Sequence, residues 1–189
     1  MQQSAESAPP AQDEVSDAEK RSALWLTNAS HSVNHFQNGI VSVMYVEVME
    51  EFGIGYVELG FLVAVRNAIG SILQGSFGLI TPFVRKTRLM AVGNIIMGIG
   101  VAISGAAGSF FGFGAGRVVV EAGSSAQHPV GASLLAGYFP KNRGTILSLN
   151  VSFAGIGGFA APLLGPLLVV WIGWRQTLLY MSVLSVVIG

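Results

Sequence analysis

Long apolar segments separated by short polar breaks dominate this sequence. They cover about residues 23–48, 56–80, 89–107, 110–139 and 145–172, and a sixth covers 176–189. An α-helix needs roughly 20 residues to cross the hydrocarbon core of a bilayer, and inside it every backbone polar group must be bonded within the protein. We therefore expect an all-α membrane protein built as a six-helix bundle. At ~1.5 Å per residue the sixth segment is too short to cross, so we expect this helix to be truncated or short.

Composition excludes several other classes of protein. Hydrophobic residues make up 51% of the chain and charged residues only 11%, well below the roughly 25% of a soluble domain. The formal net charge of +0 gives no field that would attract nucleic acid. The absence of cysteine excludes disulfide scaffolds and thiol nucleophiles. No phosphate-binding G-x-x-x-x-G-K-[ST] motif occurs, so we predict no cofactor and an ion gradient as the energy source.

The charged residues predict the orientation. Residues 1–22 are polar and poor in large apolar side chains, so we expect a disordered cytoplasmic tail before a bundle over 23–189. Only Arg175 falls in a break on the opposite side from seven other basic residues, which are Lys20, Arg21, Arg85, Lys86, Arg88, Lys141 and Arg143. Because cytoplasmic loops are enriched in Lys and Arg, we expect a cytoplasmic N-terminus. The expected location is a bacterial inner membrane.

The first apolar segment carries an unusual polar face. His31, Asn34, His35 and Asn38 follow the spacing i, i+3, i+4, i+7, which places all four on one side of a helix. We interpret this face as lining water or ligand, with His35 handling protons because imidazole titrates near neutral pH. Hydrogen bonding between helices and a metal-binding pair formed by His31 and His35 are the alternatives.

Ionisable residues also fall inside the second and fourth segments. Each charge near the bilayer centre costs at least ~2.5–3.5 kcal/mol, so we expect Arg66 to meet an anion or an acidic side chain. Arg117 and Glu121 have the i, i+4 spacing of a salt bridge, and His128 follows seven residues later, before Pro129, which can kink a helix. A static Arg117–Glu121 bridge and a proton- or substrate-linked switch on Glu121 and His128 both fit this pattern.

Several motifs together resemble the amino-terminal half of a major facilitator superfamily transporter. Residues 78–88 (GLITPFVRKTR) look like the family's loop between helices two and three, although Pro82 replaces the aspartate that latches the outward-facing state in the family. Residues 117–123 (RVVVEAG), 162–166 (PLLGP) and 173–175 (GWR) resemble the patterns of its helices four to six. Residues 123–129 (GSSAQHP) are similar to the fosmidomycin-resistance type of efflux carrier.

The resemblance implies twelve helices in two six-helix halves, of which this chain supplies one. It implies that the protein is not an enzyme but a secondary transporter, an antiporter that moves a drug or metabolite. Protons would be the coupling ion, and the lipid bilayer would surround the protein. The second half would lie in the same chain or in a dimer partner. The residues we expect along the substrate and proton pathway are His31, His35, Asn38, Arg66, Arg117, Glu121 and His128. Those expected at the cytoplasmic gate are Arg85, Lys86 and Arg88.

Two other functions fit parts of the sequence. Pro82 favours a non-transporting membrane sensor or partner subunit, because the latch aspartate is missing. A membrane metalloenzyme would use His31, His35 and His128. Because membrane di-metal enzymes need more ligands than three histidines, the main prediction includes no metal site.

Overall fold

The computed structural model describes residues 15–189, and these are helical throughout apart from short connections. The α-helices are α1 (Asp17–Val43), α2 (Tyr45–Phe52), α3 (Tyr56–Ile80), α4 (Lys86–Ala106), α5 (Phe110–Ser124), α6 (Gln127–Tyr138), α7 (Arg143–Ile172) and α8 (Trp174–Ile188). A 3-10 turn, η1 (Pro140–Asn142), joins α6 to α7. The all-α fold class expected from the sequence is confirmed.

Three of the described helices are long and apolar enough to cross a membrane, namely Tyr56–Ile80, Lys86–Ala106 and Pro140–Ile172. The others miss this standard for different reasons. α1 carries many polar residues, the fourth apolar segment is divided between α5 and α6, and α8 has 15 residues.

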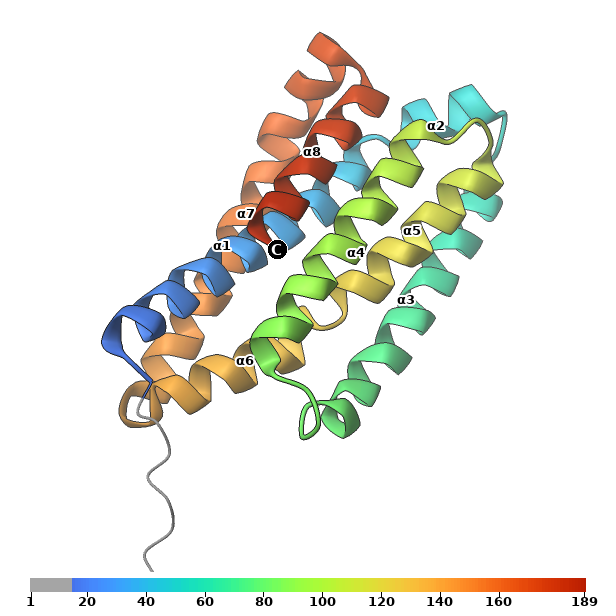
Figure 1. The fold of residues 1–189 in the computed structure, drawn as a ribbon. Helices are drawn as coiled ribbons and strands as arrows, with labels where there is room; N and C mark the ends of the chain where they lie inside the picture. The colour runs from blue at the N-terminus through green and yellow to red at the C-terminus, as the bar shows by residue number, and fades with distance from the viewer. Residues whose placement is uncertain (1–14) are drawn as a thin grey trace, which may run out of the picture.

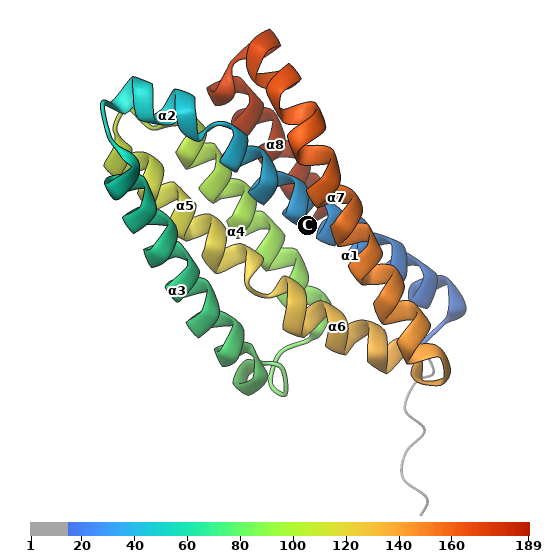
Figure 2. The ribbon, with the colours of Figure 1, turned by 180° about the vertical axis from the view of Figure 1, so that it is seen from behind.

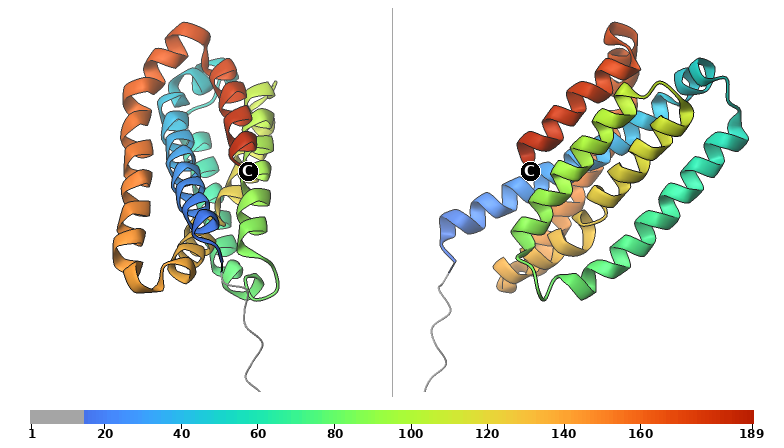
Figure 3. Two further views of the ribbon diagram at one scale, coloured as in Figure 1. Left: turned by 60° about the vertical axis from the view of Figure 1, so that its left-hand side comes forward. Right: turned by 45° about the vertical axis from the view of Figure 1, so that its right-hand side comes forward.

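The helices run up and down in a bundle (Figures 1 and 2). α1 packs along α7, and α4 packs against both α5 and α8. α3 lies at the edge of the bundle, where it contacts mainly α5. Figure 3 shows α7 on one side of α1 and α4 on the other. One end of the bundle holds the α3–α4 and α6–α7 connections and is called the basic end below; α2 and the α7–α8 connection lie at the opposite end.

The first helix starts earlier than the sequence indicated. The Ser16 side chain accepts a hydrogen bond of 3.1 Å from the Glu19 backbone N–H, and this cap begins α1 at Asp17. Residues 17–22, expected in a disordered tail, are therefore helical, whereas 1–14 lie outside the described residues. At its other end α1 stops at Val43, and the last part of the first apolar segment forms the separate helix α2.

The fourth apolar segment is broken rather than continuous. α5 ends at Ser124 and α6 begins at Gln127. Pro129 has no backbone N–H to donate to the carbonyl of Ser125, four residues earlier, so the hydrogen-bond ladder is interrupted here. The break lies where the sequence predicted a kink, and it separates Glu121 in α5 from His128 in α6.

Glycines allow two pairs of helices to approach closely. A Cβ added at Gly157 in α7 would collide with the carbonyl oxygen of Ser32 in α1. Gly100 and Gly123 make similar backbone contacts between α4 and α5. Because lipid tails are as apolar as the helices, such close van der Waals packing is the main force that holds membrane helices together.

A polar cluster closes the end of the bundle that contains α2. Arg175 at the start of α8 forms an ion pair of 2.6 Å with Glu51, which also accepts a hydrogen bond of 2.8 Å from the Trp174 indole. The same guanidinium donates to the carbonyl oxygens of Gly105 and Ala107 at the end of α4. Arg175 thereby satisfies carbonyls at a helix C-terminus, where positive charge is favourable.

This cluster predicts acid sensitivity. Hydrogen bonds from Arg175 lower the pKa of Glu51 below its usual 4.5. A carboxyl group whose pKa is lower in the folded state stabilises the protein fully at pH values above its unfolded-state pKa. This stabilisation is lost as the pH falls through the folded-state pKa. Between about pH 5 and pH 3 the Tm of the natural protein should therefore fall by roughly 2 °C more than that of Glu51→Gln. If the Tm values from thermal melts fell equally with pH in the two proteins, this role for Glu51 would be contradicted.

Candidate substrate and proton pathway

An ion pair between α3 and α5 lies inside the bundle. Arg66 Nε is 3.5 Å from Glu121 Oε2, and the two side chains are only 16% and 14% exposed. Gly70, one turn along α3, makes room for the carboxylate, since a Cβ there would collide with Glu121. The sequence left open a bridge between Arg117 and Glu121; the structure instead pairs Glu121 with Arg66 on the neighbouring helix.

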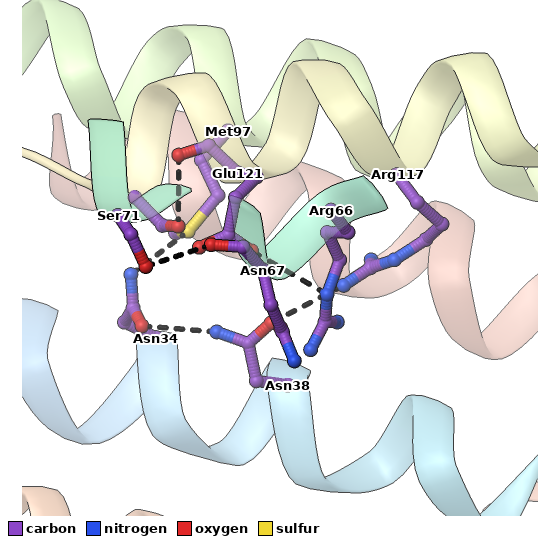
Figure 4. Close-up of polar contacts among 9 residues, drawn as sticks. Asn34, Asn38, Arg66, Asn67, Ser71, Met97, Arg117 and Glu121 are labelled. Carbon is purple, nitrogen blue, oxygen red and sulfur yellow. Dashed lines mark hydrogen bonds and ion pairs between the residues drawn. The ribbon is translucent and has the colours of Figure 1, made fainter. Parts of the chain in front are cut away.

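Arg117 bonds to an amide instead of a carboxylate (Figure 4). It is 1% exposed, and its Nη2 donates a hydrogen bond of 3.2 Å to Asn38 Oδ1 in α1. Asn38 in turn donates to Asn34 over 3.1 Å, and Asn34 donates to the sulfur of Met97 in α4 over 3.4 Å. This chain of contacts joins α5, α1 and α4.

Both arginines keep unused hydrogen-bond donors. Nε and Nη1 of Arg117 and Nη1 of Arg66 are buried, and no hydrogen-bond partner for them lies in the part of the chain that the structure describes. Figure 4 shows the Arg66 and Arg117 side chains approaching the same space beside Asn38. Two guanidinium groups face one carboxylate, Glu121, so this space has an excess of positive charge and free donors. Such a site is suited to an anionic group.

The three histidines meet beside this network. The ring centroid of His31 lies 4.9 Å from that of His35 and 4.9 Å from that of His128, and His35 and His128 are 5.6 Å apart. His31 is buried, His35 is half-buried and His128 is exposed. The sequence predicted that His31 and His35 share a face of α1. It could not place His128 against them, because that contact depends on how α6 lies after the break.

Asn150 in α7 was missed by the sequence interpretation. Its Oδ1 lies 2.8 Å from His31 Nδ1, and its Nδ2 donates a hydrogen bond of 2.8 Å to Asn28 Oδ1. An asparagine in the largely apolar segment 145–172 was the available signal. Its partner could not be read from the sequence, because it depends on how α7 packs against α1.

Other polar residues of α1 form hydrogen bonds to neighbouring helices. Gln37 donates to Ser185 Oγ and to the Met181 carbonyl in α8. Ser30 lies 2.9 Å from both Asn94 Oδ1 and Gln127 Oε1. Hydrogen bonding between helices, one of the alternatives for the polar face of α1, therefore accounts for part of its polarity.

The residues expected at a gate lie at the basic end of the bundle. Arg85 precedes α4, and Lys86 and Arg88 belong to its first turn. Lys86 Nζ donates a hydrogen bond of 3.3 Å to the Ser133 carbonyl oxygen in α6, so it links α4 to α6. Pro82 lies in the turn between α3 and α4.

A bundle of apolar helices with charged side chains inside it is compatible with a membrane transporter, and the comparison with known families shows which class it belongs to. Residues 28–189 match the Major Facilitator Superfamily, and the chain belongs to this family. The protein is thus a multi-pass membrane protein of a transporter family whose members are usually not enzymes.

Two relatives illustrate the similarity. The chain is 26% identical over 145 residues to a putative niacin/nicotinamide transporter, NiaP, of Bacillus subtilis; the match covers 75% of this chain and 36% of the relative. Its fold resembles the crystal structure of a bacterial homologue of the human lysosomal transporter Spinster, in an inward-facing and unoccupied conformation. That match has a TM-score of 0.82 and 16% identity, and it covers 92% of this chain and 42% of the Spinster homologue. The chain therefore spans less than half the length of these relatives.

Proposed function

We propose that this chain forms one six-helix half of a proton-coupled secondary transporter for a small molecule. The observation that carries the proposal is the half-buried pair of Arg66 and Glu121, 3.5 Å apart, beside unused arginine donors. When a carboxylate at membrane depth binds a proton it loses its charge and its hold on the arginine. Proton binding to Glu121 would release Arg66 and so change the contacts between α3 and α5, which couples the proton to helix movement.

The histidines extend the proton pathway. His35 lies one turn along α1 from Asn38, which bonds to Arg117, and it packs against His31 and His128. Imidazole is a common proton carrier in proteins, so this cluster would supply protonatable groups beside the α1 residues that lead to Arg117. The exposed ring of His128 makes the cluster accessible from one face of the bundle.

The substrate we propose is a small molecule with an anionic group. The free donors of Arg66 and Arg117 would bind a carboxylate, with the arginine fork matching its two oxygens. The relative named as a putative niacin/nicotinamide transporter makes nicotinate a suitable first compound, because it carries a carboxylate, and nicotinamide its neutral counterpart. The resemblance to fosmidomycin-resistance carriers makes export, in exchange for protons, the direction to test.

A second six-helix half would cover the open face of this one. Large apolar side chains of α3 and α7 are strongly exposed, among them Phe61 (72%), Leu79 (76%), Phe159 (72%) and Val170 (81%). Lipid covers such residues on the outside of a bundle, and a second half, in the same chain or in another copy, would cover those that border the pathway. In a bacterial inner membrane the basic end would face the cytoplasm, with Arg85, Lys86 and Arg88 at the gate.

The proposal is tested by proton movement in vesicles that contain the natural gene product. Addition of nicotinate should change the internal pH, reported by a fluorescent dye, in the natural protein and in the matched control Glu50→Gln. Glu50 is an exposed glutamate of α2, remote from the pair. In Glu121→Gln, which cannot exchange a proton, the signal should fall to that of empty vesicles. Full proton movement in Glu121→Gln would overturn the role of Glu121.

The alternative function predicts a different result. If no compound that binds the protein moves protons or is itself transported, a non-transporting sensor or partner subunit becomes the better explanation. The replacement of the latch aspartate by Pro82 is the feature that favours this alternative.

A further inference from the structure

We infer that His31, His35 and His128 form a binding site for a divalent transition-metal ion. Each histidine offers one ring nitrogen, and these three atoms all lie within 4.8 Å of one another. The chain contains three histidines in all, and the fold gathers them at one place from α1 and α6. The same histidines extend the proton pathway proposed above, so metal binding is a second role for this cluster, in which the ion would compete with protons for the ring nitrogens.

The hydrogen bonds of His31 prepare it to be a ligand. Asn150 Nδ2 donates to Asn28 Oδ1, which sets the orientation of the Asn150 amide and leaves its Oδ1 as an acceptor toward His31 Nδ1, 2.8 Å away. His31 Nδ1 must therefore carry the hydrogen, and Nε2 keeps its lone pair. A metal-binding histidine commonly donates its other N–H to such an outer partner, which fixes the tautomer and the ring orientation.

Two of the nitrogens available to a metal ion have no other partner among residues 15–189. His31 is 3% exposed, and Nε2 of His31 and Nε2 of His35 are both buried without a hydrogen-bond partner there. An unpartnered buried nitrogen is unfavourable, and a bound metal ion would remove this cost. His128 is exposed, so it leaves an entry path and an open coordination position for water or another ligand.

The chemistry of the donors selects the class of metal. Three imidazoles with an open fourth position suit Zn²⁺, Co²⁺, Ni²⁺ or Cu²⁺, whereas Mg²⁺ and Ca²⁺ require oxygen ligands. With metal–nitrogen distances of about 2.1 Å, tetrahedral ligands are about 3.4 Å apart. The nitrogens, all within 4.8 Å, need to approach by at most about 1.4 Å. The exposed side chain of His128 is free to make most of this movement.

The test is a titration of the natural gene product with Co²⁺, using protein purified through a tag that contains no histidine. One equivalent of Co²⁺ should produce the visible absorption of a four-coordinate cobalt–imidazole complex, and Zn²⁺ should displace it. His128→Ala, at an exposed position, should lose this absorption while keeping its thermal melt. Asn150→Ala should weaken the affinity by about 10–100-fold, because His31 loses its outer partner.

Gln74→Ala in α3 is the matched control, since it removes a half-buried polar side chain outside the histidine cluster, and it should bind as the natural protein does. Absence of cobalt absorption in the natural protein, or its persistence in His128→Ala, would overturn the site. Because binding is measured without transport, failure of the site would leave the proton role of Glu121 untouched. Conversely, proton movement retained in Glu121→Gln would contradict the transport role of Glu121 but not the metal site, which the cobalt titration tests separately.

Discussion

Replacing Gly157 by valine is expected to abolish the accumulation of folded protein. The new Cβ would overlap the backbone carbonyl of Ser32, and a backbone group cannot move aside as a side chain does. α1 and α7 would have to separate along their interface. Overpacking in a well-packed core costs about 1–3 kcal/mol, and this contact should cost about 3 kcal/mol or more. Size-exclusion chromatography of fluorescently tagged protein and thermal melts measure the effect.

The neighbouring position supplies the control. A Cβ at Gly158 meets nothing within 4 Å, so Gly158→Val makes the same chemical change in the same helix without the collision. It should yield folded protein in nearly natural amounts. Equal loss in both variants would mean that valine acts on the helix itself, and equal yields would mean that α1 and α7 do not pack as closely as described.

The second large effect is expected at the pair formed by Arg66 and Glu121. Glu121→Gln leaves two arginines close together without a carboxylate, and Arg66→Gln leaves the carboxylate without its ion-pair partner. Breaking a buried ion pair by removing one partner costs about 3–5 kcal/mol. Because both side chains keep some exposure, we expect the lower end of this range, a decrease in Tm of roughly 10 °C for Glu121→Gln.

The double variant Arg66→Gln and Glu121→Gln separates the pair from its surroundings. Removing both charges leaves no uncompensated partner, so the double variant should recover at least about half of the stability lost by Glu121→Gln. Thermal melts of the four proteins complete the double-mutant cycle. Additive losses would show that the two side chains do not interact, despite their separation of 3.5 Å.

The fold class could be predicted from the sequence because helix formation in a membrane depends on local composition. The apolar segments and the polar breaks determine where helices form, and Pro129 indicated the interruption near Ser125. The start of α1 was missed because its cap at Ser16 lies in a polar region with no apolar periodicity to extend the helix.

The sequence could limit the choice of partner for each residue of the site but could not decide it. The i, i+4 spacing made Arg117 a candidate partner of Glu121, but the choice of Arg66 depends on the rotation of α3 against α5, which spacing within one helix does not reveal. The same limit applies to His128 and Asn150, whose contacts with His31 come from helices far apart in the sequence. The free-energy cost of a charge inside the membrane still predicted that Arg66 has a partner, but not which residue it is.

The break between α5 and α6 divides the fourth segment into two mechanical units. α5, which carries Glu121, packs closely against α4 through backbone contacts at Gly100 and Gly123. α6 packs more loosely, against α1, α4 and α7. A swing of α6 about this joint would carry His128 away from His31 while the distance between Arg66 and Glu121 stayed the same. A joint at this place would allow one membrane segment to open the histidine cluster and the ion pair at different times.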